Sequence, residues 1–132
     1  MPHRPYRRTI AARSARLTLV ETNLTKNDYI RKLLDAYRRM PGSTGMVRRN
    51  DRLLAAALHD RGVPLLAVEN ALILAAARRI VRSPDAPTLQ PVRSLYYVLP
   101  VIDEVLEVHV SPDYYRYLQF KIDQALNPQY AL

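Results

Sequence analysis

The feature that most constrains the fold is a long apolar run in the middle of the chain. Between Leu65 and Ala77 the only polar side chains are Glu69 and Asn70. A helix that is apolar nearly all round must be buried nearly all round, because an exposed apolar face would stay in contact with water. Two arginines close the run, which makes it too short to cross a bilayer. It therefore predicts the central helix of a helical domain rather than a membrane span.

The start of this run also has the spacing of the turn and second helix of a helix-turn-helix. Gly62 would occupy the turn, and Val68 and Leu72 would take the usual buried positions. The base-reading face would then carry residues 64–67, which include no Arg, Lys or Gln, and Asn70 is the one side chain suited to pairing with a base. We therefore interpret this helix as the core of a helical hairpin and expect nucleic-acid contacts elsewhere.

Four further segments have the periodicity of amphipathic helices: residues 24–40, 50–62, 92–108 and 111–126. The first of these is expected to begin at a capping box formed by Thr25 with Asp28. The second is expected to begin at an N-cap of Asn50 or Asp51. Its expected inward face is Leu53, Leu54, Ala57 and Leu58.

Glycine and proline mark the expected helix ends. Gly62 is expected at a left-handed C-cap, and Pro64 at the first position of a helix that runs to Val81 or Arg82. Pro100 should kink or split the helix over 92–108. Ser111 is expected to cap the last helix. The expected apolar face of that helix is Tyr114, Tyr117, Leu118, Ile122 and Leu126.

No strand pattern interrupts these helices. The predicted fold class is all-α, a compact bundle of about five helices. Residues 21–132 would form this single domain, and residues 1–20, with Pro2 and Pro5, would form a flexible basic N-terminal arm.

Charge is distributed unevenly along the chain. The net charge is +8 at pH 7. Residues 1–62 contribute +9 and residues 63–132 contribute −1. Arginine supplies most of the positive charge, and its guanidinium binds phosphate with two parallel hydrogen bonds. The basic half therefore predicts a surface for a polyanion. The predicted contact residues are Arg4, Arg7, Arg8, Arg13 and Arg16 in the arm, Arg31, Lys32, Arg38, Arg39, Arg48, Arg49 and Arg52 in the first helical hairpin, and Arg116 near the C-terminus.

Tyrosines form two clusters, at residues 96–97 and 114–117. An exposed tyrosine beside an arginine can stack on an unpaired base. Tyr114 and Tyr117 share the expected apolar face, which leaves Tyr115 beside Arg116 as the expected exposed pair and the candidate for base stacking. Burial in the core or in a protein interface is the alternative for all of these rings.

Catalytic and metal-binding patterns are not apparent. The histidines at 3, 59 and 109 are far apart, cysteine is absent, and the acidic group Asp103, Glu104 and Glu107 has no second carboxylate pair to complete a metal site. We expect no enzyme activity, no metal and no cofactor. The N-terminus has arginines in place of an apolar secretory segment, and we expect a cytoplasmic protein without membrane contact.

Two segments, NDRLLAAALHDRGVPLLAVENALILAAARRI and LQPVRSLYYVLPVIDEVLE, show a helix, a turn with glycine, a longer helix of the VxxAL kind and a helix with tyrosines. This order resembles the small helical domain of DnaD-like replication-initiation proteins over about half of the chain. The resemblance implies DNA or replisome binding and assigns no individual site residue. The composition equally resembles the small helical subunits of RNA-guided surveillance complexes.

These observations favour a non-enzymatic nucleic-acid-binding protein, an accessory factor in DNA replication or of a mobile element or phage, with DNA and RNA both open as ligands. One alternative is a small subunit of a larger nucleoprotein effector complex. The other is an adaptor that binds a protein partner, or a second copy of itself, through its fourth and fifth helices.

Overall fold

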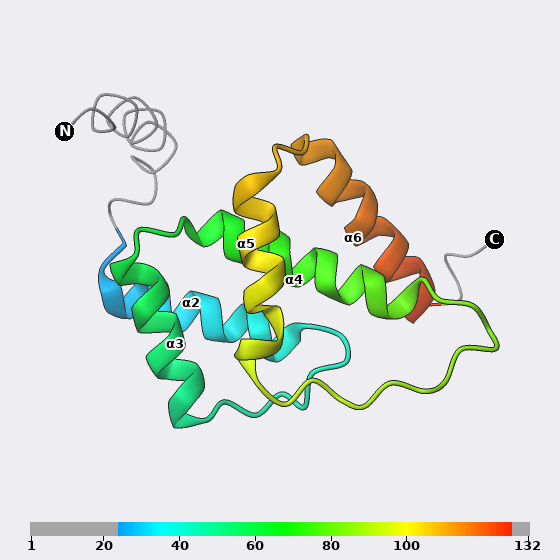
Figure 1. The fold of residues 1–132 in the computed structure, drawn as a ribbon, viewed down its shortest axis with the longest axis horizontal. Coiled ribbons are helices and arrows are strands. Elements are labelled where there is room, and N and C mark those ends of the chain that lie inside the picture. Colours follow the sequence, from blue (N-terminus) through cyan, green and yellow to red (C-terminus); the bar gives the residue numbers. More distant parts are fainter. Residues whose placement is uncertain (1–23, 128–132) are drawn as a thin grey trace.

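The computed structural model describes residues 24–127, which contain five α-helices, one 3-10 turn and no strand (Figure 1). The predicted all-α class is therefore confirmed. The predicted arm at residues 1–20 lies outside the described residues. The elements are α2 (Lys26–Arg39), α3 (Arg49–Asp60), α4 (Leu65–Ile80), the 3-10 turn η1 (Leu95–Val98), α5 (Leu99–Glu107) and α6 (Pro112–Leu126).

Helix α4 is the centre of the bundle (Figure 1). It packs against α2, α5, α6 and η1, whereas α3 packs against α2 and η1. Leu65, Val68, Leu72 and residues 75–77 of α4 are buried, and Leu66 is the large residue of its first turn that faces solvent. The prediction of a core helix is confirmed. A base-reading role does not suit this helix, because its sides are covered by three other helices.

Helix α2 begins where the sequence predicts, because the Thr25 hydroxyl accepts a hydrogen bond from the backbone N–H of Asp28. The predicted start of α3 is wrong. This helix begins at Arg49 with Arg48 as the N-cap, so Asp51 lies in its first turn and is buried. The inward face is correspondingly rotated to Leu54, Ala55 and Leu58, while Leu53 and Ala57 are exposed. The physical reason is that the Asp51 carboxylate turns inward to bind the backbone of η1.

Three proline and glycine predictions can be compared with the structure. Gly62 has φ 75° directly after α3, as expected for a left-handed C-terminal residue. Pro64 is the N-cap of α4 rather than its first residue, and the helix ends at Ile80, slightly before the predicted end. Pro100 does split the fourth helix, since η1 precedes it and α5 begins at Leu99.

In the last helix, the prediction of which side chains are buried is partly wrong. Ser111 caps α6 as predicted, and its hydroxyl accepts from the backbone N–H of Asp113. The buried face, however, consists of Tyr115, Leu118 and Ile122, while Tyr114 and Tyr117 are 43% and 53% exposed. Spacings of three and four fit both sets, and the set that includes Tyr115 is the one that the bundle buries.

No helix within residues 24–127 is long and apolar enough to cross a membrane.

Candidate nucleic-acid interface

Two loops far apart in the sequence meet at one edge of the molecule, at the bottom of Figure 1. The backbone N–H of Thr44 donates to the Val92 carbonyl at 2.9 Å, and the N–H of Val92 donates to the Gly42 carbonyl at 2.7 Å. These bonds form an isolated parallel bridge between Ser43 and Val92. They join the segment after α2 to the segment before η1, and we call residues 41–47 and 82–94 the paired loops.

A buried carboxylate fixes the start of α3 beside the second loop. Asp51 is 1% exposed and accepts hydrogen bonds from the backbone N–H of Arg48 at 2.9 Å and of Leu95 at 2.9 Å, and from the Ser94 hydroxyl at 3.2 Å. The first turn of α3 is therefore held against residues 94–95. This places Arg48, Arg49 and Arg52 at the same end of the fold as Arg93.

The last turn of α4 is connected to both loops through Arg79. Its guanidinium donates to the Gln90 carbonyl at 2.7 Å and to the Tyr97 hydroxyl at 3.3 Å. Its carbon Cζ lies 5.5 Å from the centre of the Tyr97 ring. Gly42 gives the side chain room, because a Cβ there would lie 2.7 Å from Arg79 Nε. Arg82, one turn beyond, donates to the Pro87 carbonyl at 2.7 Å.

Ion pairing separates the basic residues into two groups. Away from the paired loops, Lys26, Arg61 and Arg78 bind Asp60, Asp103 and Glu104 respectively. Around the paired loops, the arginines form no ion pair with a carboxylate in the described part of the chain. We call this second group the basic edge; it consists of Arg48, Arg49, Arg52, Arg79, Arg82 and Arg93.

The other predicted contact residues lie in different surroundings. Arg31, Arg38 and Arg116 each bind an acid three residues earlier in their own helix, namely Asp28, Asp35 and Asp113. Lys32 is exposed on α2. The predicted contacts in the arm, Arg4, Arg7, Arg8, Arg13 and Arg16, lie outside the described residues.

The sequence prediction omits half of the basic edge. Arg79, Arg82 and Arg93 belong to the half of the chain with a net charge of −1. A count of charges along the sequence hides them, because this half of the chain contains slightly more acidic than basic side chains. The pairing of the two loops brings Arg93 to the end of the fold where α3 begins, whereas Arg79 and Arg82 are held against the second loop farther along, at the end of α4. The one available signal is the cluster RRIVR at the end of the central helix.

A hollow of about 380 Å³ opens between the first of the paired loops, the end of α4 and the second loop. Arg79 and Arg82 are the charged side chains that line it, and no carboxylate of the described residues does. The hollow thus combines positive charge with space at the surface, which suits an anionic group.

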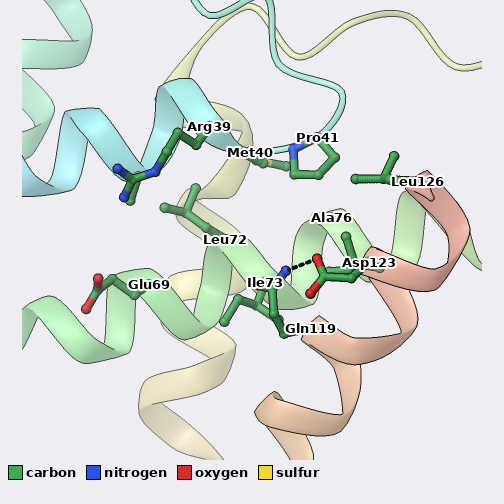
Figure 2. A pocket seen from close by; sticks show the side chains of 12 residues that line it. Arg39, Met40, Pro41, Glu69, Leu72, Ile73, Ala76, Gln119, Asp123 and Leu126 are labelled. Carbon is green, nitrogen blue, oxygen red and sulfur yellow. Dashed lines mark hydrogen bonds between the residues drawn. The ribbon is translucent and has the colours of Figure 1, made fainter. Parts of the chain in front are cut away.

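A second hollow, of about 330 Å³, lies between the end of α2, α4 and α6 (Figure 2). Arg39 lines it together with Glu69 and Asp123, and Asp123 accepts a hydrogen bond from Gln119 at 3.0 Å. Two carboxylates in one small hollow repel phosphate. This hollow is therefore a poor site for a polyanion, although it contains one of the predicted arginines.

The expectation that Tyr115 is exposed is wrong. Its side chain is 6% exposed, it meets the Tyr114 ring edge-on at 5.9 Å between ring centres, and burial raises the pKa of its hydroxyl. Its ring has no free face for a base. Exposed rings occur instead on η1, where Tyr96 and Tyr97 are 49% and 48% exposed and Tyr97 contacts Arg79 of the basic edge.

The remaining polar side chains do not assemble a reactive centre in the described part of the chain. His59 packs edge-on against Tyr29 at 5.1 Å between ring centres. No group of three His, Cys, Asp or Glu residues suited to a metal ion gathers within residues 24–127. In the acidic group on α5, Glu104 binds both terminal nitrogens of Arg78, and these hydrogen bonds lower the pKa of its carboxyl.

In comparisons with known proteins, no family model, curated protein or solved structure matches the chain.

Proposed function

We propose that this protein is a non-enzymatic nucleic-acid-binding protein that holds the phosphate backbone on its basic edge. The observation that carries the proposal is a series of six arginines along the paired loops, three at the start of α3 and three from the other half of the chain, that form no ion pair with any described carboxylate. The like charges of these arginines repel one another, and a bound polyanion would relieve that repulsion.

The mechanism follows from the chemistry of guanidinium. A guanidinium can bind a phosphate with two parallel hydrogen bonds and displace condensed counterions into solution. Arg79 and Arg82, which already donate to backbone carbonyls, would contribute mainly their charge. Contacts of this kind position a nucleic acid without reading its sequence. Arg31, Arg38 and Arg116 stay outside the proposed surface, because each shares its surroundings with a carboxylate.

The test is a fluorescence-anisotropy titration of the full chain with labelled single-stranded and duplex oligonucleotides at several salt concentrations. We expect the logarithm of the affinity to fall linearly with the logarithm of salt, and the triple variant R48A/R49A/R52A to reduce that slope by about one unit for each phosphate that is no longer bound. The matched control removes the same charge elsewhere, by K26A/R61A/K121A. Equal reductions in the two triple variants, or no binding at low salt, would overturn the proposal.

Two further variants separate the contributions to binding. R82A/R93A tests whether the second half of the chain takes part, and deletion of residues 1–20 measures what the arginines of the arm add. The basic-edge proposal requires R82A/R93A to bind oligonucleotides more weakly than the unmodified chain does, whatever the deletion of residues 1–20 shows. If R82A/R93A binds as tightly as the unmodified chain, the surface is confined to the first hairpin.

The alternative is a protein-binding adaptor, and one observation favours it. Helix α6 packs mainly against α4 and exposes Tyr117 and Phe120, at 53% and 56%. An adaptor of this kind would bind its partner in moderate salt and without residues 1–20. Y117A/F120A should then abolish partner binding and leave oligonucleotide binding unchanged.

A further inference from the structure

The basic edge has a feature that phosphate binding alone does not use: two exposed aromatic rings on a rigid turn. Leu95 and Val98 of η1 are fully buried, and this leaves Tyr96 and Tyr97, the residues between them, pointing outward. The turn is fixed at its start, since Asp51 accepts from the N–H of Leu95 and the Ser94 hydroxyl accepts from the N–H of Tyr96.

Arg79 holds one of these rings in place. Its guanidinium contacts the Tyr97 ring and hydroxyl, and a further hydrogen bond to the Gln90 carbonyl prevents it from swinging away. The ring nevertheless remains about half exposed, at 48%. A planar cation and an aromatic ring that are already ordered lose little conformational entropy when another flat group stacks on them.

We propose, resting on the function proposed above, that the ligand is single-stranded nucleic acid, whose unpaired bases stack on Tyr96 and Tyr97 while the arginines of the basic edge bind its phosphates. In a duplex the faces of the bases are covered by their neighbours, so these rings would have nothing to stack on. In a single strand the faces are free, and a basic groove with aromatic rings is the usual way to bind it without sequence preference.

The experiment compares single-stranded DNA, single-stranded RNA and duplex DNA of equal length in the anisotropy titration, with Y96L and Y97L as variants. The matched control is Y117L, because Tyr117 is equally exposed and has Lys121 Nζ 5.7 Å from its ring centre, but lies on α6 away from the basic edge. We expect each of Y96L and Y97L to weaken single-strand binding by about 5- to 150-fold, which is the range for removal of one stacked base. Duplex binding should change less than about twofold, and Y117L should leave all three affinities unchanged.

A second variant keeps an aromatic ring beside Arg79 while removing the tyrosine hydroxyl. The chain contains no tryptophan, so Y97W introduces a single reporter that can still stack. We expect Y97W to keep single-strand affinity and its fluorescence to be quenched by single strands but not by duplex.

The outcomes distinguish this inference from the proposed function. If Y96L and Y97L bind single strands as tightly as the unmodified chain while R48A/R49A/R52A does not, the surface binds phosphate but does not stack bases, and the inference is wrong. Duplex binding as tight as single-strand binding would also overturn it. Failure of all three oligonucleotides to bind would remove both proposals. The DNA and RNA arms show which single strand is preferred.

Discussion

The buried carboxylate of Asp51 accepts a hydrogen bond from the backbone N–H of Leu95, a residue 44 positions later in the chain. With the bonds to Arg48 and Ser94, it joins the start of α3 to the turn that carries the exposed tyrosines. One aspartate thus aligns the arginines of the first hairpin with the aromatic rings of η1.

Substitution of Asp51 should destabilise the protein more than any substitution of an exposed acid. D51A leaves the buried N–H of Leu95 and the partly buried N–H of Arg48 without an acceptor, and we expect a decrease of about 2–4 kcal/mol in the free energy of unfolding. D51N should be less destabilising, because its amide oxygen can still accept. Urea unfolding followed by circular dichroism measures both, with the exposed D85A as control. A decrease in D51A no larger than that of D85A would contradict the role of Asp51.

Removal of the Tyr37 hydroxyl should not destabilise the protein. This hydroxyl is buried and has no hydrogen-bond partner among the described residues, and burial beside Asp51 raises its pKa. We expect Y37F to be neutral or to stabilise by up to about 1 kcal/mol, since an unsatisfied polar group leaves the core. The matched control is Y29F, which removes the bond from the Tyr29 hydroxyl to the Val63 carbonyl at 2.7 Å and should cost about 1 kcal/mol. Thermal melts of the two variants should therefore shift in opposite directions, or only that of Y29F should shift.

Part of the acid sensitivity of the fold should come from Glu104. Hydrogen bonds from Arg78 hold the pKa of this carboxyl below its usual value. A depressed pKa in the folded state contributes stability above the unfolded pKa of about 4.3, and that contribution is lost as the pH falls through the folded value. The difference in unfolding free energy between the unmodified chain and E104Q should therefore be largest near neutral pH and disappear in acid. A difference that is independent of pH would show that the pair contributes by packing alone.

Gly42 and Gly62 offer a matched pair of substitutions. Both have positive φ, 90° and 75°, so an alanine at either position strains the backbone and should cost about 1–2 kcal/mol of stability. Only at Gly42 does the new Cβ approach Arg79, whereas nothing lies within 4 Å at Gly62. G42A should therefore also weaken oligonucleotide binding by displacing the guanidinium, and G62A should not. Equal affinities in the two variants would show that the position of Arg79 is unimportant for binding.

The sequence by itself determined the elements that depend on local chemistry. The apolar run from Leu65 identified the core helix, and Thr25, Gly62 and Ser111 marked helix ends that the structure confirms. These signals can be read from sequence because a cap or a left-handed residue is decided within about four residues of chain.

Only the tertiary structure decided which faces are buried and which charges meet. Tyr115 and Tyr114 are adjacent and chemically identical, and the way α6 packs in the bundle, mainly on α4, buried only Tyr115. The basic edge exists because the bridge between Ser43 and Val92 aligns two loops that are distant in sequence. Contacts of this kind have no local pattern, since their partners are set by the way whole helices pack around α4.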